Sequence, residues 1–276
     1  MDLIVFDLDG TLLNAASKIS PYTRETLQRL TSRGIAYTVA TGRALHASRD
    51  ILDGHDFRLP QAYKNGVLIW NPVQQDYSHH NFLTLDEIQH VLEAVMRQHV
   101  TPFMSTLEPG NVHAIYHPPL QNEVEERLAA DFRSRSGVGV FPASEMPADA
   151  EITNVSALGI PSAIDAVEQM ISDEPDLVAY AGTALEGAEL NWIDIHHVDA
   201  SKGNAVEVFR RELGASRVLC FGDSNNDLSM FASADESYAP SSAKPEVLEA
   251  ATAIIGHHDE DGIARFLRER FALDTD

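Results

Sequence analysis

Two carboxylates separated by one residue follow an apolar run near the start of the chain. The run Leu3–Phe6 leads directly into Asp7 and Asp9, and Gly10 follows at once. An aspartate can attack a phosphoryl group to form an aspartyl-phosphate, and a second acid close by can protonate the leaving oxygen and then activate water. An acidic turn after a strand would use the same residues, and Asp-x-Asp-Gly is also common in turns and calcium loops. This stretch alone therefore leaves both interpretations open.

A second pair of acids repeats this arrangement late in the chain. The apolar run Arg217–Phe221 is followed by Asp223 and, four residues later, by Asp227. In open α/β sheets, sites form where strands end, so two acidic strand ends of one sheet can meet in space. Clustered carboxylates repel one another, whereas a hard, oxygen-rich site suits Mg²⁺, which would also reduce the repulsion between an anionic nucleophile and a phosphate. Together the two motifs predict a magnesium site; a capped loop is the alternative for the second motif alone.

Two further motifs have the chemistry to hold a phosphate. Thr41 and Gly42 end a second predicted strand, where a hydroxyl and free backbone N–H groups can bind a phosphate oxygen. An ordinary strand-to-helix turn is the alternative. Lys202, one of four lysines in the chain, begins a predicted helix, where the helix dipole disfavours a cation. A cation there could bridge Asp7 and the phosphate and stabilise a charged transition state, and a solvated lysine is the alternative.

The pattern of the first seventy residues indicates how these motifs are positioned. Apolar runs at 2–7 and 35–40 predict strands, and they alternate with helical patterns at 21–33 and 44–52. Ser20 is a good N-cap for the first of these helices. The alternation of strands and helices predicts a parallel sheet with crossover helices.

This alternation of strands and helices stops in the middle of the chain and resumes at Ala200. Residues 64–67 carry a hairpin signal, because Asn-Gly suits the positive φ values of a tight turn. The stretch 76–81 (DYSHHN) is polar and predicts a break, and a helix follows from Leu85 to about His99. The elements expected next are helices at 121–134 and 161–172 and strands at 112–116, 155–160, 177–181 and 189–195. After Ala200 we expect helices at 201–213, 226–234 and 261–270 and a strand at 250–255. A second module therefore interrupts a first one between about 79 and 194.

Composition and charge exclude several classes of function. The chain has 276 residues, of which 44% are hydrophobic, and a formal net charge of -22. Such a charge repels nucleic acids and anionic membrane surfaces, so neither is an expected partner. The single cysteine, Cys220, lies in an apolar run, so we expect it to be buried and the compartment to be the reducing cytoplasm. No signal peptide or membrane-spanning run is recognisable, and nothing indicates an oligomeric state.

In this order, the motifs resemble the haloacid dehalogenase (HAD) superfamily of phosphohydrolases, and most closely its Cof-like subclass, type IIB. The resemblance spans nearly the whole chain, and each short motif is weak alone while the ordered set is specific. The matching stretches are 6–13 (FDLDGTLL), 40–43 (ATGR), 64–66 (KNG), 201–203 (SKG), 222–227 (GDSNND) and 259–264 (DEDGIA). The resemblance implies an α/β fold with a Rossmann-like parallel-sheet core, at 1–78 plus 195–276. It also implies an inserted α/β cap at 79–194 that selects the leaving group.

The same resemblance implies roles for the matching residues. Asp7 would be the nucleophile and Asp9 the general acid/base. Phosphate binding would fall to Thr41, Gly42, Lys202 and Asn226. The Mg²⁺ ligands would be Asp7, Asp9 (through its backbone carbonyl), Asp223 and, in a supporting position, Asp227. One departure is Ser242, which stands where related sequences usually carry asparagine; it affects a hydrogen bond near the site rather than the acids.

The leading hypothesis is a Mg²⁺-dependent phosphatase for small phosphorylated metabolites, such as sugar phosphates or a phosphorylated cofactor. A phosphomutase on the same scaffold would share Asp7 and Asp9, and release of inorganic phosphate separates the two. A non-catalytic phosphate-binding regulatory protein would have little need for Asp9, and a dehalogenase is a weaker alternative because Asp9 serves phosphate chemistry. The negative charge is compatible with an anionic substrate because Mg²⁺, Lys202 and Arg43 would set the local field.

Two other features are given structural interpretations. Histidine pairs occur at 79–80, 196–197 and 257–258 and are interpreted as loop residues rather than as zinc ligands. Trp70 and Trp192 are interpreted as packing residues, and the sequence assigns no residue of the insert to a substrate.

Overall fold

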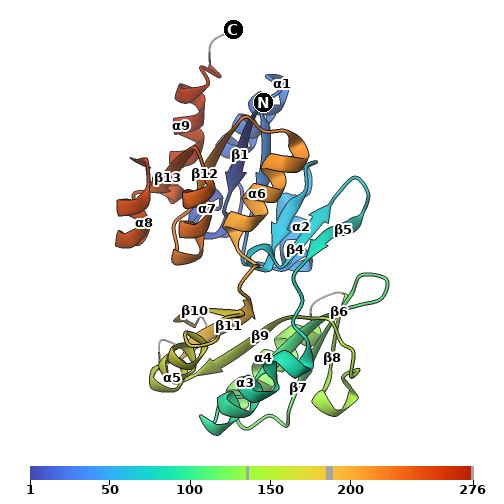
Figure 1. Cartoon of the computed structure of the whole chain (residues 1–276). Helices are drawn as coiled ribbons and strands as arrows, with labels where there is room; N and C mark the ends of the chain where they lie inside the picture. The colour runs from blue at the N-terminus through green and yellow to red at the C-terminus, as the bar shows by residue number, and fades with distance from the viewer. Residues whose placement is uncertain (135–136, 185–188, 275–276) are drawn as a thin grey trace. The chain divides into compact units, whose positions relative to one another are not determined.

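The chain divides into two units. The computed structural model describes residues 1–134, 137–184 and 189–274 (Figure 1). The first unit, here called the core unit, comprises Met1–His80 and Ala200–Asp276, and the second, the inserted unit, comprises Asn81–Asp199. The insert expected from the sequence, 79–194, begins two residues before the inserted unit begins. It ends five residues before the inserted unit ends. None of the described helices has both the length and the apolar character needed to cross a membrane.

The core unit is built on a five-stranded parallel sheet in the order β14-β13-β12-β1-β2. Its strands are β1 (Asp2–Phe6), β2 (Ala36–Val39), β12 (Arg217–Phe221), β13 (Glu236–Pro240) and β14 (Ala253–Ile255). Ile4 and Phe6 of β1 belong to one buried hydrophobic cluster, and Leu3 and Val5 belong to another. The sheet is thus covered on both faces, which explains why its central strands are continuous apolar runs.

Helices from both ends of the chain cover this sheet. α1 (Pro21–Ser32) and α9 (Gly262–Arg270) pack on the Ile4 face, and α6 (Lys202–Leu213) and α7 (Leu228–Ser233) pack on the other. The remaining helices of the unit are α2 (Leu45–Leu52) and α8 (Pro245–Ala250). α1 begins where predicted, because the Ser20 hydroxyl accepts a hydrogen bond from the backbone N–H of Thr23 (3.0 Å).

A small antiparallel sheet completes the core unit. It has the order β3-β4-β5, with β3 (Gln61–Tyr63), β4 (Leu68–Asn71) and β5 (Asp76–His80). The predicted hairpin signal falls between β3 and β4, where Lys64 and Asn65 both have positive φ. This connection lies beside the end of β2, since the Asn65 backbone N–H donates to the Thr41 carbonyl (2.9 Å).

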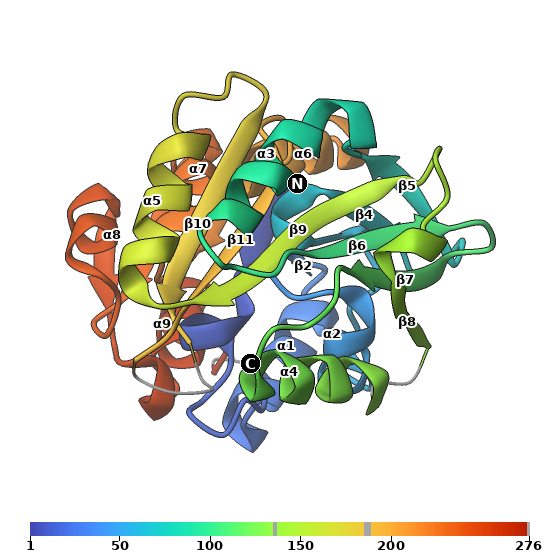
Figure 2. The ribbon, with the colours of Figure 1, turned by 90° about the horizontal axis from the view of Figure 1, so that it is seen from below.

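The inserted unit has a six-stranded sheet in the order β10-β11-β9-β6-β7-β8. Its strands are β6 (Phe103–Glu108), β7 (Val112–His117), β8 (Val138–Pro142), β9 (Ile152–Gly159), β10 (Leu177–Thr183) and β11 (Asn191–His197). All pairs are antiparallel except β7 with β8. α3 (Leu85–Arg97) and α5 (Pro161–Ile171) share the main hydrophobic cluster on one face (Figure 2). α4 (Glu123–Ser134) supplies Ala129 to a smaller cluster with Phe103 and Ile115.

Several elements differ from the sequence-based expectations. The interpretation of 76–81 as a break is wrong, because Asp76–His80 forms β5, an edge strand whose residues alternate between exposed and half-buried without an apolar side. The pairs at 79–80 and 196–197 therefore lie in strands rather than loops. β6, β8, β13 and α8 were not expected. β13 ends in proline, and its burial comes from neighbours on both sides rather than from an apolar run of its own.

Candidate active site

Three adjacent parallel strands end in polar residues at one edge of the core sheet. β1 lies between β12 and β2. Asp7 directly follows β1, Thr41 comes two residues after β2, and Asp223 comes two residues after β12. Because the strands run in the same direction, their carboxyl ends meet at one edge, where residues from both ends of the chain come together.

A glycine allows the two acidic loops to approach closely. Gly10 has a φ of +70°, and a Cβ atom at this position would lie 2.4 Å from Oδ2 of Asp223. Any larger residue would therefore displace that carboxylate. The neighbouring Thr11 hydroxyl donates to Oδ1 of Asp223 (3.3 Å). The fold thus brings together the two acidic motifs that the sequence singled out.

Lys202 lies between two of the carboxylates. Its Nζ donates to Oδ1 of Asp7 and to Oδ1 of Asp227, each at 2.6 Å. The lysine is 1% exposed, Asp227 is fully buried and Asp7 is 5% exposed. The Lys202 side chain is therefore a buried cation held by two buried anions, and the interpretation as a solvated lysine is wrong.

Asp227 anchors the second acidic loop. Its Oδ2 accepts hydrogen bonds from the backbone N–H groups of Asp223 (2.8 Å) and Ser224 (2.9 Å), while its Oδ1 is held by Lys202. Both oxygens are thus occupied within the protein. Oδ2 of Asp7, by contrast, accepts from no described residue.

Burial and like charges act on the protonation of these acids. Burial raises the pKa of Asp7 well above its usual value, Lys202 opposes this, and the charges of Asp227 and Asp223 add to it. Burial, followed by the charge of Asp227, raises the pKa of Asp223 to about 6. Burial alone would lower the pKa of Lys202, but Asp227 and Asp7 outweigh it and raise that pKa. With one cation among three acids, this edge lacks positive charge.

These residues have the chemistry of a divalent-cation site. Asp7, Asp223 and Asp227 each offer an oxygen, and these atoms all lie within 4.8 Å of one another. A bound dication would favour the ionised carboxylates that burial disfavours. Carboxylate oxygens are the ligands that Mg²⁺ prefers, so the donor set fits this metal.

The side chain of Asp9 lies in an ion pair away from the lysine. The Arg43 guanidinium donates from Nε to Oδ2 of Asp9 (2.6 Å) and from Nη2 to Oδ1 (2.5 Å). The Arg43 side chain is 24% exposed and that of Asp9 is 54% exposed. A bidentate pair fixes the plane of a carboxylate as well as its position. Sequence reasoning gave Arg43 only a general electrostatic role; its place two residues after Thr41 was the available signal.

Hydroxyl and amide groups occupy the β2 side of this edge. The Thr41 hydroxyl accepts from the backbone N–H of Arg43 (3.1 Å), so its own proton remains for an acceptor. Asn226 donates from Nδ2 to Oδ1 of Asn65 (2.9 Å), which leaves a second amide N–H. Gly42 lies beside this pair, since a Cβ there would be 3.2 Å from Oδ1 of Asn65. Sequence reasoning missed Asn65, whose signal was the Asn-Gly dipeptide in the 64–66 motif.

Ser242 forms a hydrogen bond with His258, the second histidine of the 257–258 pair. Its hydroxyl lies 2.8 Å from Nδ1 of His258, whose pKa is lowered by burial and then by the neighbouring His257. The backbone N–H of Lys244 donates to the Asp223 carbonyl (3.0 Å), so this segment supports the second acidic loop.

Comparisons with known proteins bear on this arrangement. A family model described as haloacid dehalogenase-like hydrolase matches residues 4–267. The putative phosphatase YxeH of Bacillus subtilis is 28% identical over 97% of both chains. YitU of the same bacterium, named as a 5-amino-6-(5-phospho-D-ribitylamino)uracil phosphatase, is 26% identical over 98% of both chains. The solved structure of BT4131, described as a HAD subclass IIB sugar phosphatase, shares the fold with a TM-score of 0.76 at 20% identity, covering 99% of this chain and 100% of that one.

Proposed function

Because the chain belongs to the haloacid dehalogenase-like hydrolases, we propose that it is a Mg²⁺-dependent phosphatase acting on phosphate monoesters of small metabolites. The observation that carries this proposal is the buried group at the end of β1, where Lys202 joins Asp7 to Asp227 and Asp223 lies close by. The relatives named as phosphatases support hydrolysis as the reaction class.

In the first step, Asp7 is the nucleophile. A carboxylate oxygen of Asp7 forms a bond to phosphorus while the bond from phosphorus to the ester oxygen breaks. The leaving oxygen takes a proton from Asp9 and departs as an alcohol, which leaves an aspartyl-phosphate and an anionic Asp9. Lys202 holds Asp7 in place and offsets negative charge in the transition state. The Thr41 hydroxyl and the second amide N–H of Asn226 are the donors proposed for the phosphoryl oxygens.

In the second step, Asp9 acts as a base. It removes a proton from a water molecule whose oxygen attacks phosphorus, and the bond to Asp7 breaks to release inorganic phosphate. Asp9 is then protonated for the next cycle. Arg43 donates to both oxygens of Asp9, so one of these oxygens must leave the guanidinium when Asp9 carries the proton. When bound, Mg²⁺ supplies positive charge against the phosphate and lowers the repulsion between the two anions.

In this proposal, Asp7 and Asp223 bind the Mg²⁺ directly. Asp227 supports them, because both of its oxygens are already held by Lys202 and the backbone. The backbone carbonyl of Asp9 is the further protein ligand that the family resemblance implies. We assign the choice of leaving group to the inserted unit.

The deciding experiment measures phosphate release from a panel of phosphate esters with Mg²⁺ or with EDTA. We expect Mg²⁺-dependent release by the wild type and a loss of about 10⁴-fold or more in Asp7→Asn, because a nucleophile cannot be replaced by its neighbours. Asp165→Asn, which removes an exposed carboxylate on α5, is the matched control and should retain full activity. Release that Asp7→Asn does not reduce would overturn the proposal. Isomerisation of a sugar monophosphate without release would indicate a mutase instead.

A further inference from the structure

A hollow lies beside helices α1 and α9 of the core unit, and we call it the α1–α9 hollow. Its volume is about 440 Å³, within the range of roughly 300–1,000 Å³ that is usual for small-molecule sites. The lining residues come from the first turn of α1, from α9 and from the turn after α9; they are Tyr22, Arg265, Arg268, Glu269, Ala272 and Asp274. None of them belongs to the group that Lys202 forms with the three aspartates, so the hollow is separate from the candidate active site.

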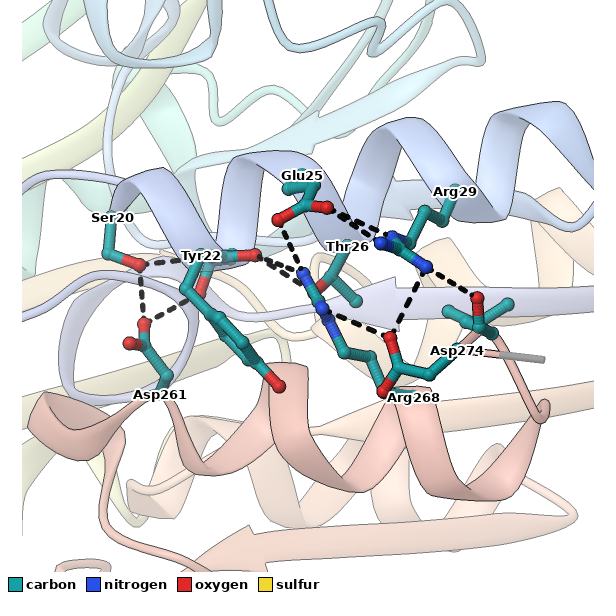
Figure 3. A network of polar contacts seen from close by, with 10 residues as sticks. Ser20, Tyr22, Glu25, Thr26, Arg29, Asp261, Arg268 and Asp274 are labelled. Carbon is teal, nitrogen blue, oxygen red and sulfur yellow. Dashed lines mark hydrogen bonds and ion pairs between the residues drawn. The ribbon is translucent and has the colours of Figure 1, made fainter. Parts of the chain in front are cut away.

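Arg268 and Tyr22 form a fixed wall of this hollow. The Arg268 guanidinium lies 3.9 Å from the centre of the Tyr22 ring (Figure 3). Its Nη1 donates to Oδ1 of Asp274 (3.1 Å), its Nη2 to Oε2 of Glu25 (3.0 Å) and its Nε to the Thr26 hydroxyl (2.8 Å). Each of the three guanidinium nitrogens is therefore engaged within the protein. This arginine shapes the hollow, and its charge is already offset by the two acids.

Arg265 and Glu269, in contrast, form no ion pair with any residue of 1–134, 137–184 or 189–274. They are four residues apart on α9, so they lie on the same side of the helix, where such residues commonly pair with each other. Here the Arg265 guanidinium is turned elsewhere: its Nε donates to the Glu260 carbonyl (3.0 Å), and it lies 5.4 Å from the centre of the Tyr22 ring. These two contacts restrict the guanidinium and leave its Nη1 and Nη2 for a ligand.

The α1–α9 hollow thus offers one cation and one anion that the described residues do not neutralise. A phosphate or another simple anion would be attracted by Arg265 but repelled by Glu269, and a simple amine would meet the opposite combination. A molecule that carries both charges satisfies both side chains. The Nη1 and Nη2 groups of a guanidinium bind a carboxylate through two parallel hydrogen bonds, and a glutamate carboxylate accepts a charge-assisted hydrogen bond from an ammonium group.

We propose that the α1–α9 hollow binds a free α-amino acid. The carboxylate of the amino acid accepts from Nη1 and Nη2 of Arg265, and its ammonium group donates to the Glu269 carboxylate. The side chain of the amino acid occupies the rest of the hollow, beside Tyr22 and Ala272. An α-amino acid carries both charged groups on one carbon, which suits a cation and an anion one helical turn apart. The proposal concerns binding alone and does not rest on the proposed phosphatase function.

Isothermal titration calorimetry of the full chain tests the site without any assay of activity. The probes are L-alanine, L-serine, L-leucine, L-glutamine and L-phenylalanine, titrated without Mg²⁺ so that no metal at the ends of the strands contributes. We expect saturable binding of at least one of them. For leucine, isocaproate lacks the ammonium group and isoamylamine lacks the carboxylate. Each analogue should bind about 10-fold or more weakly, because each loses one charge-assisted contact.

Variants of the two unpaired residues locate the binding. Arg265→Gln and Glu269→Gln should each weaken binding by about 10-fold while far-UV circular dichroism stays unchanged, since both side chains are exposed. Arg265→Lys keeps the charge but loses the two parallel hydrogen bonds, so it should weaken binding several-fold in a folded protein. Arg127→Gln and Glu126→Gln remove the same charges from exposed positions of α4 and should leave binding unchanged.

Three outcomes would overturn the amino-acid site: no saturable binding of any probe, equal affinities of wild type and Arg265→Gln, or isocaproate binding as tightly as leucine. Inorganic phosphate tests whether the hollow is a plain anion site instead. If phosphate binds through Arg265 and Glu269→Gln strengthens that binding, the hollow takes anions and the proposal is wrong. Because these titrations measure no turnover, they decide the question even if no phosphate ester is hydrolysed.

Discussion

The core unit holds two networks of charged side chains whose environments differ. One lies at the end of β1 and contains Lys202 with three aspartates. The other joins α1 to α9, where Arg268 contacts Glu25 and Asp274 (Figure 3). Arg29 extends this second network to the same two acids.

The two networks differ in burial and in charge balance. In the α1–α9 network, two arginines meet two acids, and the Glu25 and Asp274 side chains are 51% and 58% exposed. In the strand-end network, one lysine meets three acids, and Lys202 and Asp227 are almost completely buried. In a balanced, solvated network each charge has a partner of opposite sign, whereas the excess negative charge of a buried network is relieved by protonation or by a cation from outside. A hollow of about 440 Å³ beside Arg268 is lined mainly by charged residues such as Arg265 and Glu269, without such an imbalance.

The pKa values of acids in the two networks shift in opposite directions. Hydrogen bonds from Arg29 and then Arg268 lower the pKa of Glu25. Burial raises the pKa of Asp223 to about 6. The comparison suggests a general criterion: a charged cluster is a candidate site when the fold holds it in an ionisation state that its own residues do not stabilise.

Removal of the buried lysine should have the largest effect. In Lys202→Met, Asp7 and Asp227 lose their cation while remaining buried, so the free energy of unfolding at pH 7 without Mg²⁺ should fall by about 3–5 kcal/mol. The rate of ester hydrolysis should fall by about 10²–10³-fold. Urea unfolding and phosphate release measure the two quantities. Lys244→Met, at an exposed position, is the control, and equal stability of the two variants would contradict the contrast drawn between the networks.

Arg43→Gln should act on the rate rather than on stability. Because Arg43 holds both oxygens of Asp9, its loss should leave Asp9 misplaced and lower kcat by about 10²-fold. The loss should be smaller for p-nitrophenyl phosphate, whose leaving group needs no proton. In an Asp9→Asn background the same substitution should change little, since it acts through Asp9. Arg49→Gln, on the exposed side of α2, is the control; additive effects of Arg43→Gln and Asp9→Asn would show that Arg43 has a separate role.

The elements that were predictable are those whose own residues show an apolar run or a helix cap. β1 and β12 are continuous apolar runs because both of their faces are buried, and α1 has a proline and a serine cap at its start. β5 was not predictable, because an edge strand with two polar sides has no apolar period. β13 was missed because its position depends on β12 and β14, which flank it only in the folded chain.

The residues of the candidate site also divide into those that the sequence identifies and those that only the fold brings together. The acidic motifs, Thr41 and Lys202 could be singled out because their residue types and their places at strand and helix ends already indicate chemistry. The pairs of Arg43 with Asp9 and of Asn65 with Asn226 depend on distances between loops that the sequence does not specify.

Disruption of the α1–α9 network should change stability and leave the rate alone. The Arg268 side chain is 9% exposed, and it donates from Nε to the Thr26 hydroxyl (2.8 Å) and stacks on the Tyr22 ring at 3.9 Å. Arg268→Leu should therefore lower the free energy of unfolding by about 2 kcal/mol with kcat and KM unchanged. Arg127→Leu, at an exposed position of α4, is the control. A fall in kcat for the folded Arg268→Leu protein would show that the two networks are coupled.

The smallest effect expected concerns pH. The folded-state pKa of Asp223, about 6, lies above its usual value of 3.8, so its ionised form costs stability. In EDTA, the free energy of unfolding should therefore gain about 1 kcal/mol from Asp223 as the pH falls from 7.5 to 5, a gain that Asp223→Asn should lack. Glu25 has the opposite sign, because its lowered pKa gives stability that is present above its usual pKa of 4.5 and is lost only as the pH falls below that value. Urea unfolding of wild type and Asp223→Asn at pH 7.5 and 5 isolates the effect of Asp223, and unfolding of wild type and Glu25→Gln between pH 5 and 3 isolates that of Glu25. Saturating Mg²⁺ should reverse the trend for Asp223, since the metal requires the ionised carboxylate; an unchanged trend with Mg²⁺ would mean that Asp223 is not a ligand.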